Sequence, residues 1–260
     1  MSFENLNSLY EEIKEVSQLL CERGWAEKNA GNLSVDITDA MRERQRNKDK
    51  FPIELRRRFT YLRERVFLIT PSGSKFRDIA KSPKEILMLI KMSRDGKGYY
   101  ILSKNPDQRP TSEVITHLRI QNYLRESNSD AKVVLHTHPT DLIAISHIRE
   151  FQSTERLSNI LISAHPEVFI YLRNKIGFVK YILTGSERLA DATLRYVKQG
   201  KSIIVWERHG AIAIEKDLTS AFDHLDIANK AAEISLWLFS ANKRPIMLNK
   251  EEMRELKSIS

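Results

Sequence analysis

Apolar side chains recur with a helical period near the start of the chain. Leucine, isoleucine and valine fall about every 3.6 positions over residues 6–23, which predicts an amphipathic helix that ends at Gly24. Thr111 and Ser112 precede a second periodic stretch, and either hydroxyl is typical of a helix cap. Further helices are predicted over 110–125, 140–148, 186–198 and 218–239.

Short apolar runs bounded by turn-forming residues predict strands between these helices. A polar turn leads into a strand over 29–35, and more strands are predicted over 66–69, 99–102, 132–136, 178–183, 202–206 and 211–214. Strands and helices alternate without an internal repeat or a long linker. We therefore expect one α/β domain over residues 1–260, with a mixed β-sheet covered by helices.

Composition narrows the class of protein. Of the 260 residues, 41% are hydrophobic and 29% are charged, which is the balance of a globular chain. No apolar run reaches the roughly eighteen residues of a membrane-spanning helix, and no secretory signal is visible at the N-terminus. The single cysteine, Cys21, excludes an internal disulfide framework. We expect a cytoplasmic protein with no membrane partner.

Part of the formal net charge of +8 is concentrated in a segment at about 39–65. Basic surfaces can bind nucleic acid. Here, acidic residues are interleaved with the basic ones, and no nucleic-acid-binding motif accompanies them. We interpret the segment as a solvated insertion and expect no nucleic-acid partner.

Three histidines are candidate metal ligands. His136 and His138 are two residues apart at the end of a predicted strand, so both rings leave the same face. His209 lies in a tight turn between two apolar strands and could supply a third nitrogen. Three imidazoles leave one position of a zinc-like ion open, as in catalytic sites. The His136–His138 pair alone could equally be packed in the core. His209 alone could be a turn residue that is hydrogen bonded to the local backbone.

Small polar turns are candidate anion-binding elements. Taken singly, each is more typical of ordinary turn or cap chemistry, but together they could surround one phosphate, because backbone N–H groups and a helix start favour an anion. They contain Asn29, Gly31, Asn32, Ser72, Gly73, Ser74, Thr111 and Ser112.

These motifs occur together in an order that resembles the class II aldolase/adducin superfamily. The similar segments contain the polar turn after Gly24, the Pro-Ser-Gly turn, the Pro-Thr-Ser-Glu sequence, the His-Thr-His-Pro sequence and the Glu-Arg-His-Gly turn. They span 24–34, 70–76, 110–113, 134–144 and 204–210. The resemblance covers nearly the whole chain and implies a class II aldolase-like fold.

The resemblance also implies residue roles. His136, His138 and His209 match the metal ligands, which implies one Zn²⁺ or another divalent ion per subunit. Glu113 matches the acid/base residue, and Glu167 matches a second carboxylate implicated in aldehyde handling. The cradle for the substrate phosphate is matched by Asn29, Gly31, Asn32, Ser72, Gly73, Thr111 and Ser112.

The activity implied is retro-aldol cleavage of a ketose 1-phosphate through a metal-stabilised enediolate. L-Rhamnulose 1-phosphate is the expected substrate, and dihydroxyacetone phosphate and L-lactaldehyde are the expected products. Relatives of this kind are cyclic homotetramers, so the resemblance implies a homotetramer that acts on a small phosphorylated sugar.

Alternatives stay open at this point. The same scaffold serves sugar-phosphate epimerases and dehydratases, and a non-catalytic adducin-like domain would share the fold. Residues 146–178 match the family weakly, so the identity of the aldehyde is open and Glu167 could be a surface glutamate. His117 lies four residues after Glu113 on the same predicted helix face, and we interpret it as a hydrogen-bonded helix residue.

Overall fold

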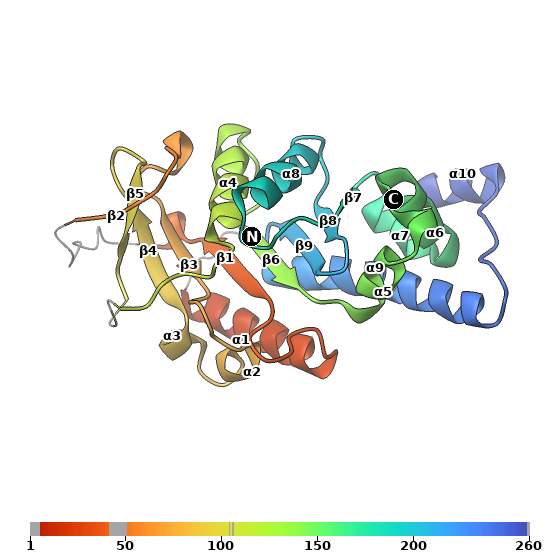
Figure 1. The fold of residues 1–260 in the computed structure, drawn as a ribbon, viewed down its shortest axis with the longest axis horizontal. Coiled ribbons are helices and arrows are strands. Elements are labelled where there is room, and N and C mark those ends of the chain that lie inside the picture. Colours follow the sequence, from red (N-terminus) through yellow and green to blue (C-terminus); the bar gives the residue numbers. More distant parts are fainter. Residues whose placement is uncertain (1–5, 42–50, 104, 106, 259–260) are drawn as a thin grey trace.

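A mixed β-sheet runs along the length of the molecule (Figure 1). The computed structural model describes residues 6–41, 51–103, 105 and 107–258. Within these residues the sheet has nine strands in the order β2-β5-β4-β3-β1-β6-β9-β8-β7. Only β7 and β8 are parallel neighbours in that described sheet. The strands are β1 Asn32–Asp36, β2 Ile53–Glu54, β3 Val66–Ile69, β4 Met88–Met92, β5 Gly98–Ile101, β6 Val133–Thr137, β7 Ile176–Val179, β8 Ile203–Trp206 and β9 Gly210–Glu215.

Helices cover both faces of the sheet. Figure 1 shows α4 and α8 on one side of the central strands and α1 on the other. The predicted mixed sheet covered by helices is thus confirmed. The helices are α1 Leu6–Glu22, α2 Phe76–Ile79, α3 Pro83–Ile86, α4 Val114–Glu126, α5 Thr140–Ser146, α6 Thr154–Ala164, α7 Pro166–Leu172, α8 Glu187–Val197, α9 Leu218–Ser240 and α10 Lys250–Ser258.

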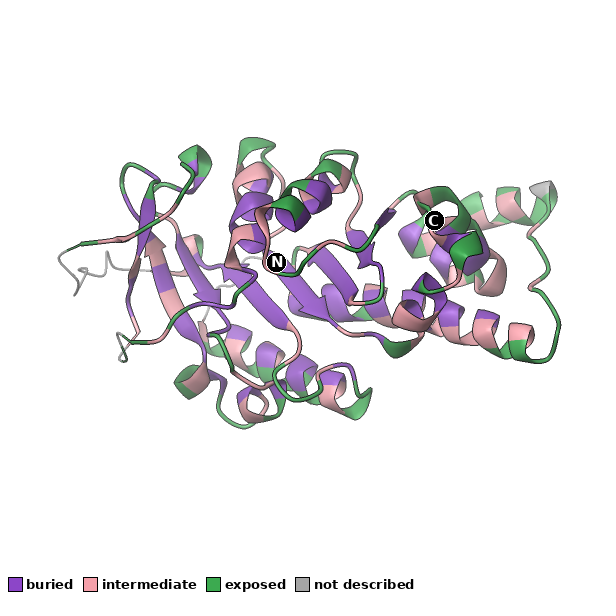
Figure 2. Ribbon diagram, viewed as in Figure 1, coloured by how far each residue is buried: buried purple, intermediate pink, exposed green. Residues whose placement is uncertain are grey.

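The central strand β6 lies between two parts of the apolar core, and a third part packs around β3, β4 and β5. Val133 and Leu135 point to the face that packs against α1 and α9. Val134 points to the opposite face, where it packs with residues of α4 and α8. Side chains alternate along a strand, so a strand buried on both faces needs a continuous apolar run, and β6 has one. Figure 2 shows the resulting band of buried residues along the middle of the sheet.

Strand direction brings several chain segments together at one side of the sheet, where strands begin or end. The starts of β1 and β9 and the ends of β3 and β6 meet there, because each neighbouring pair is antiparallel. The ends of β8 and β7 reach the same edge, since β8 is antiparallel to β9 and β7 is parallel to β8. The turns that follow or precede these six strand ends are therefore neighbours in space.

Two predicted boundaries are corrected by the structure. The helix predicted from residue 110 begins at Val114. Before it, Thr111 donates its backbone N–H to the carbonyl of Thr70 at 2.9 Å, and Ser112 and Glu113 form a turn. The strand predicted over 178–183 is β7, which ends at Val179. Beyond that residue, the N–H of Tyr181 donates to the Glu207 carboxylate at 2.8 Å instead of to a neighbouring strand.

The charged segment at 39–65 lies partly outside the described residues, which resume at Phe51. Two of its described basic side chains form ion pairs within the chain: Arg65 lies 2.8 Å from Asp36, and Arg57 lies 3.4 Å from Glu187. Among the helices of the described residues, none combines the length and the apolar character needed to cross a membrane.

Candidate active site

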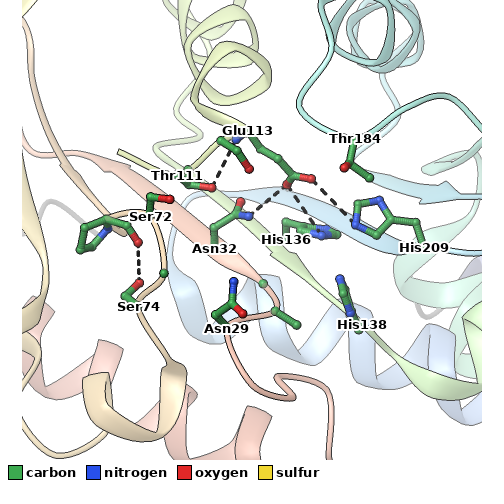
Figure 3. Close-up of a pocket in the computed structure, with 15 residues that line it drawn as sticks. Asn29, Asn32, Ser72, Ser74, Thr111, Glu113, His136, His138, Thr184 and His209 are labelled. Atoms are coloured by element: carbon green, nitrogen blue, oxygen red, sulfur yellow. Dashed lines mark hydrogen bonds and ion pairs between the residues drawn. The ribbon is translucent and has the colours of Figure 1, made fainter. Parts of the chain in front are cut away.

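A polar pocket of about 200 Å³ lies at the edge of the sheet where the six strand ends meet (Figure 3). It brings together every predicted phosphate-binding residue, the three predicted metal ligands and Glu113. None of its lining residues among those described is Lys or Arg. The lining consists of Asn29, Ala30, Gly31, Asn32, Pro71, Ser72, Gly73, Ser74, Thr111, Ser112, Glu113, His136, His138, Thr184 and His209.

The three histidine rings face one another on one side of the pocket. His136 is on β6, His138 follows that strand, and His209 lies in the turn between β8 and β9. The ring centroids are 5.2 Å apart for His136 and His138, 4.8 Å for His136 and His209, and 5.1 Å for His138 and His209. Their candidate ligand nitrogens all lie within 4.8 Å of one another. This grouping could hold a metal ion.

Hydrogen bonds determine which nitrogen is available in the rings of His136 and His138. Nδ1 of His136 lies 2.9 Å from the carbonyl oxygen of Ala211, and Nδ1 of His138 lies 2.7 Å from a carboxylate oxygen of Glu27. Both partners can only accept, so each Nδ1 carries the proton and each Nε2 keeps a free lone pair. Such outer partners also fix the ring orientation of metal-binding histidines.

Burial keeps the rings of His136 and His209 neutral. Removal from water, together with the neighbouring His138, lowers the pKa of His136 to about 3. Burial is also the largest cause that lowers the pKa of His209 to about 3, followed by the influence of His136. Neutral imidazole is the form that binds a metal, so the donor set fits Zn²⁺ with one position open.

A glycine allows the β8–β9 turn to approach the histidine pair. A Cβ atom on Gly210 would lie 2.4 Å from the carbonyl oxygen of Thr137 and 3.0 Å from ring carbons of His136 and His138. Any other residue at this position would push β9 away from the end of β6. Gly210 therefore places His209 beside the other two rings.

Glu113 is the residue that immediately precedes α4, and it lies next to the three histidines. It is 4% exposed, and its two carboxylate oxygens lie 3.7 Å from Nε2 of His136 and 3.9 Å from Nε2 of His209. One of these oxygens accepts a hydrogen bond of 3.0 Å from the side-chain amide of Asn32. A carboxylate at this place can exchange a proton with a molecule that contacts the three histidines.

The opposite side of the pocket is built from turns tied together by backbone contacts. Ser72 donates its N–H to the carbonyl of Arg109 at 2.8 Å, and Pro71 and Pro110 form an isolated antiparallel β-bridge. Gly31 has φ +77°, and a Cβ there would lie 2.9 Å from the carbonyl oxygen of His136. Because no side-chain cation of the described residues lines the pocket, an anion there would depend on N–H groups, hydroxyls and the metal site.

Glu167 is not brought into this group. It lies on α7, where one carboxylate oxygen is 2.9 Å from Nδ1 of His165, and it does not line the pocket. The role that the family resemblance implies for Glu167 stays a prediction. His117 is fully buried with both ring nitrogens hydrogen bonded, as expected of a hydrogen-bonded helix residue.

Two residues of the site were not predicted from the sequence. Glu27 belongs to the first similar segment, but only the fold shows that its carboxylate holds His138. Thr184 enters the pocket from the segment after β7 and lies near His209 (Figure 3). No local motif marks Thr184, since its position depends on the pairing of β7 with β8.

Comparisons with known proteins identify relatives that match most of the chain. The model of the Class II Aldolase and Adducin N-terminal domain matches residues 11–236. A rhamnulose-1-phosphate aldolase of Bacteroides thetaiotaomicron is 32% identical over 260 residues, covering 97% of this chain and 95% of that protein. A rhamnulose-1-phosphate aldolase of Listeria welshimeri is 28% identical over 237 residues, covering 87% of this chain and 84% of that protein.

Solved structures show the same fold. A sugar-phosphate aldolase from Thermotoga maritima superposes with a TM-score of 0.78 at 33% identity, covering 92% of this chain and 98% of that one. An L-fuculose 1-phosphate aldolase shares the fold with a TM-score of 0.62 at 20% identity, covering 97% of this chain and 95% of that one. By family match and by its similarity to these aldolases, the chain belongs to the class II aldolase and adducin family.

Proposed function

We propose that this protein is a metal-dependent aldolase that cleaves L-rhamnulose 1-phosphate into dihydroxyacetone phosphate and L-lactaldehyde. The observation that carries the proposal is the position of Glu113, 3.7 Å and 3.9 Å from two of three grouped histidines, at the edge of a polar pocket. The substrate is suggested by similarity to rhamnulose-1-phosphate aldolases over almost the whole chain.

The residues divide the work between binding and proton transfer. Zn²⁺ held by His136, His138 and His209 would supply Lewis-acid stabilisation of negative charge on substrate oxygens. The turns with Ser72, Gly73, Thr111 and Ser112 would bind the phosphate through hydroxyl and N–H groups. The carbon skeleton would then lie between the phosphate turns and the histidines.

Glu113 then moves the proton at carbon. The C4 hydroxyl proton passes to solvent, and breakage of the C3–C4 bond releases C4 as the aldehyde. The electron pair of the broken bond stays on the three-carbon fragment as an enediolate. Glu113 takes up a proton from solvent and delivers it to C3 of this fragment to give dihydroxyacetone phosphate, and it removes the same proton in the condensing direction.

We also propose that the native ion is zinc and that the chain assembles as a homotetramer, as the resemblance implies. Three grouped imidazoles support zinc, because this donor set is typical of catalytic zinc sites. Elemental analysis of the purified protein and light scattering coupled to size-exclusion chromatography test these two points.

The test of the activity is a panel of phosphorylated sugars offered to the zinc-loaded protein. The panel contains L-rhamnulose 1-phosphate, L-fuculose 1-phosphate and L-ribulose 5-phosphate. A dehydrogenase-coupled assay measures triose phosphate, and NMR identifies every product. We expect triose phosphate to be released fastest from L-rhamnulose 1-phosphate. A zinc-replete protein that releases none from any ketose 1-phosphate contradicts the proposal, and an epimerised or dehydrated product indicates the alternative activities on this scaffold.

A further inference from the structure

Behind Glu113, a row of buried polar side chains joins α4 to β1. Asn32 and Ser34 are two residues apart on β1, so their side chains leave the same face of the strand. Glu113, His117 and Gln121 are spaced four residues apart and lie along one side of α4. Two strand residues span about 6.6 Å and four helical residues span about 6 Å. The side chains on β1 therefore have nearly the same spacing as those on α4 and can contact them one after another.

The side chains in these rows are hydrogen bonded one to the next. The amide nitrogen of Asn32 lies 3.0 Å from Oε2 of Glu113, and Oδ1 of Asn32 lies 2.6 Å from Nε2 of His117. Nδ1 of His117 lies 2.8 Å from the hydroxyl of Ser34, which also receives a contact of 3.4 Å from Gln121. All five residues are at most 7% exposed, so water does not compete for these bonds.

The direction of every bond follows from the carboxylate at its end. An ionised carboxylate only accepts, so Asn32 must turn its NH₂ group toward Glu113 and its oxygen toward His117. That oxygen can only accept, so Nε2 of His117 carries a proton. Burial lowers the pKa of His117 to about 4, so at pH 7 the ring has only this one N–H. Its Nδ1 then accepts from the hydroxyl of Ser34.

The far end of the row is fixed to the backbone. Gln121 donates its side-chain N–H to the carbonyl oxygen of Lys132 at 2.9 Å, which orients the amide before it reaches Ser34. The backbone N–H of His117 donates to the carbonyl of Glu113 at 3.2 Å within the first turn of α4. The ring of His117 therefore has little freedom to turn while the sheet and helix are folded.

Asn32 is consequently more than a phosphate ligand. Its oxygen is used by His117 and one of its two N–H groups is used by Glu113. One N–H remains for a substrate anion. The side chain can hold Glu113 and contact the phosphate at once only if His117 keeps the amide in this orientation.

We infer that His117 is a positioning residue for the proposed aldolase reaction: through Asn32, its Nε2–H holds the Glu113 carboxylate in the orientation that faces the three histidines. The inference rests on the proposed function for its kinetic consequence. The arrangement itself is a property of the folded chain and can be measured without any reaction.

The first experiment measures the tautomer of His117. Protein labelled with ¹⁵N-histidine is compared with His117→Gln, which identifies the His117 signals by their loss. We expect Nε2 of His117 to be protonated and Nδ1 to be unprotonated at pH 7. A ring that is protonated at Nδ1, or at both nitrogens, overturns the inference whether or not the protein cleaves a sugar phosphate.

The second experiment compares two variants of matched size. His117→Gln can place an N–H where Nε2 of His117 lies, whereas His117→Met cannot donate to Asn32. For zinc-loaded His117→Met, we expect kcat to fall about 10- to 100-fold, as when a reacting group is misplaced by about 1 Å, while KM changes by less than about threefold. For His117→Gln, we expect kcat to recover to within about threefold of the wild type. Zinc content and melting temperature are measured for both.

The outcomes separate positioning from packing. A folded His117→Met variant with wild-type kcat overturns the inference, and so does an equal loss in both variants, because a role in packing alone does not distinguish a donor from a thioether. If His117→Met does not fold, Ser34→Ala makes the same test, since it removes the hydroxyl that fixes the tautomer. Its kcat is expected to fall about 3- to 10-fold, consistent with the loss of one buried hydrogen bond, and wild-type kcat in this variant contradicts the inference.

Failure of the proposed function gives a different result. A zinc-loaded wild type that releases no triose phosphate refutes the aldolase proposal. The His117 tautomer, together with the Asn32–Glu113 distance in a crystal structure of His117→Met, then decides the positioning. We expect that distance to lengthen beyond hydrogen-bonding range, and an unchanged distance overturns the inference.

Discussion

One side of the pocket is formed by side chains that the fold already holds in place, and the other side is formed by short turns. On the first side, His136 and His138 have hydrogen-bond partners outside the pocket, and Glu113 accepts a hydrogen bond from Asn32, which lines it. On the second side, the turns around Ser72 and Thr111 are joined by backbone contacts and offer hydroxyl and N–H groups.

This difference predicts different consequences of mutation. Groups that develop or transfer charge must be oriented before reaction, so changes on the histidine side are expected to act mainly on kcat and on metal affinity. A turn that grips a phosphate contributes several weak contacts, so a change there is expected to act mainly on KM. Each variant below tests one side of the comparison.

The largest effect is expected for His136→Ala. The substitution removes one of the three candidate ligand nitrogens, and His136 is the most buried of the three histidines. We expect bound zinc to be lost and kcat/KM to fall by about 10³-fold or more. Elemental analysis and the triose-phosphate assay measure both quantities. His224→Ala is the control, because His224 pairs with Glu215 and does not line the pocket. A variant at 136 that keeps stoichiometric zinc and its activity contradicts the assignment.

Glu113→Gln separates proton transfer from metal binding. The amide keeps the size of the side chain but cannot accept the proton at carbon, so kcat is expected to fall about 10²- to 10⁴-fold. Zinc content should stay at the wild-type level, because the three histidines are unchanged. The assay is release of triose phosphate, with exchange of the dihydroxyacetone phosphate C3 proton into D₂O as a second readout. Wild-type exchange in this variant removes Glu113 from the proposed role.

Glu27→Ala tests the partner of His138. Without the carboxylate, Nδ1 of His138 loses the acceptor that orients the ring, and zinc affinity is expected to fall about 10- to 100-fold. Competition with a chromogenic chelator measures the affinity. Glu27→Gln is the matched variant, because it retains an acceptor oxygen, and it should lose less. Equal affinities in the wild type and Glu27→Ala show that this hydrogen bond does not contribute to metal binding.

The smallest effect is expected on the turn side, for Ser72→Ala. Loss of one hydroxyl from several phosphate contacts is expected to raise KM about 3- to 10-fold, which corresponds to about 0.5–1.5 kcal/mol of binding free energy. Inhibition by inorganic phosphate should weaken by a similar factor. A fall in kcat with unchanged KM, measured by the same assay, would remove the distinction between the two sides.

The sequence contained enough to predict the pocket because its residues occur in short contiguous motifs at strand ends. The predicted strands at 66–69 and 132–136 correspond to β3 and β6, and antiparallel pairing with β1 then brings their polar ends together. Most of the predicted helices agree with the structure to within a few residues for the same reason, since their apolar period was long and regular.

Other features depend on contacts that no local pattern contains. Thr184 reaches the pocket because β7 is parallel to β8, and the partner of His138 is more than a hundred residues away in sequence, at Glu27. Residues 146–178 contain α6 and α7, which we did not predict, and the match of Glu167 depended on spacing through this segment. In the structure, Glu167 contacts His165 instead of the pocket.

The central claim is that three imidazole nitrogens from two distant segments bind one metal ion. X-ray absorption spectroscopy at the zinc edge tests it most directly, with wild type and His209→Gln loaded with one equivalent of zinc. We predict three imidazole nitrogens at about 2.0–2.1 Å in the wild type and two in the variant. Identical spectra for the two proteins, or a wild-type shell with fewer than three imidazoles, would contradict the claim.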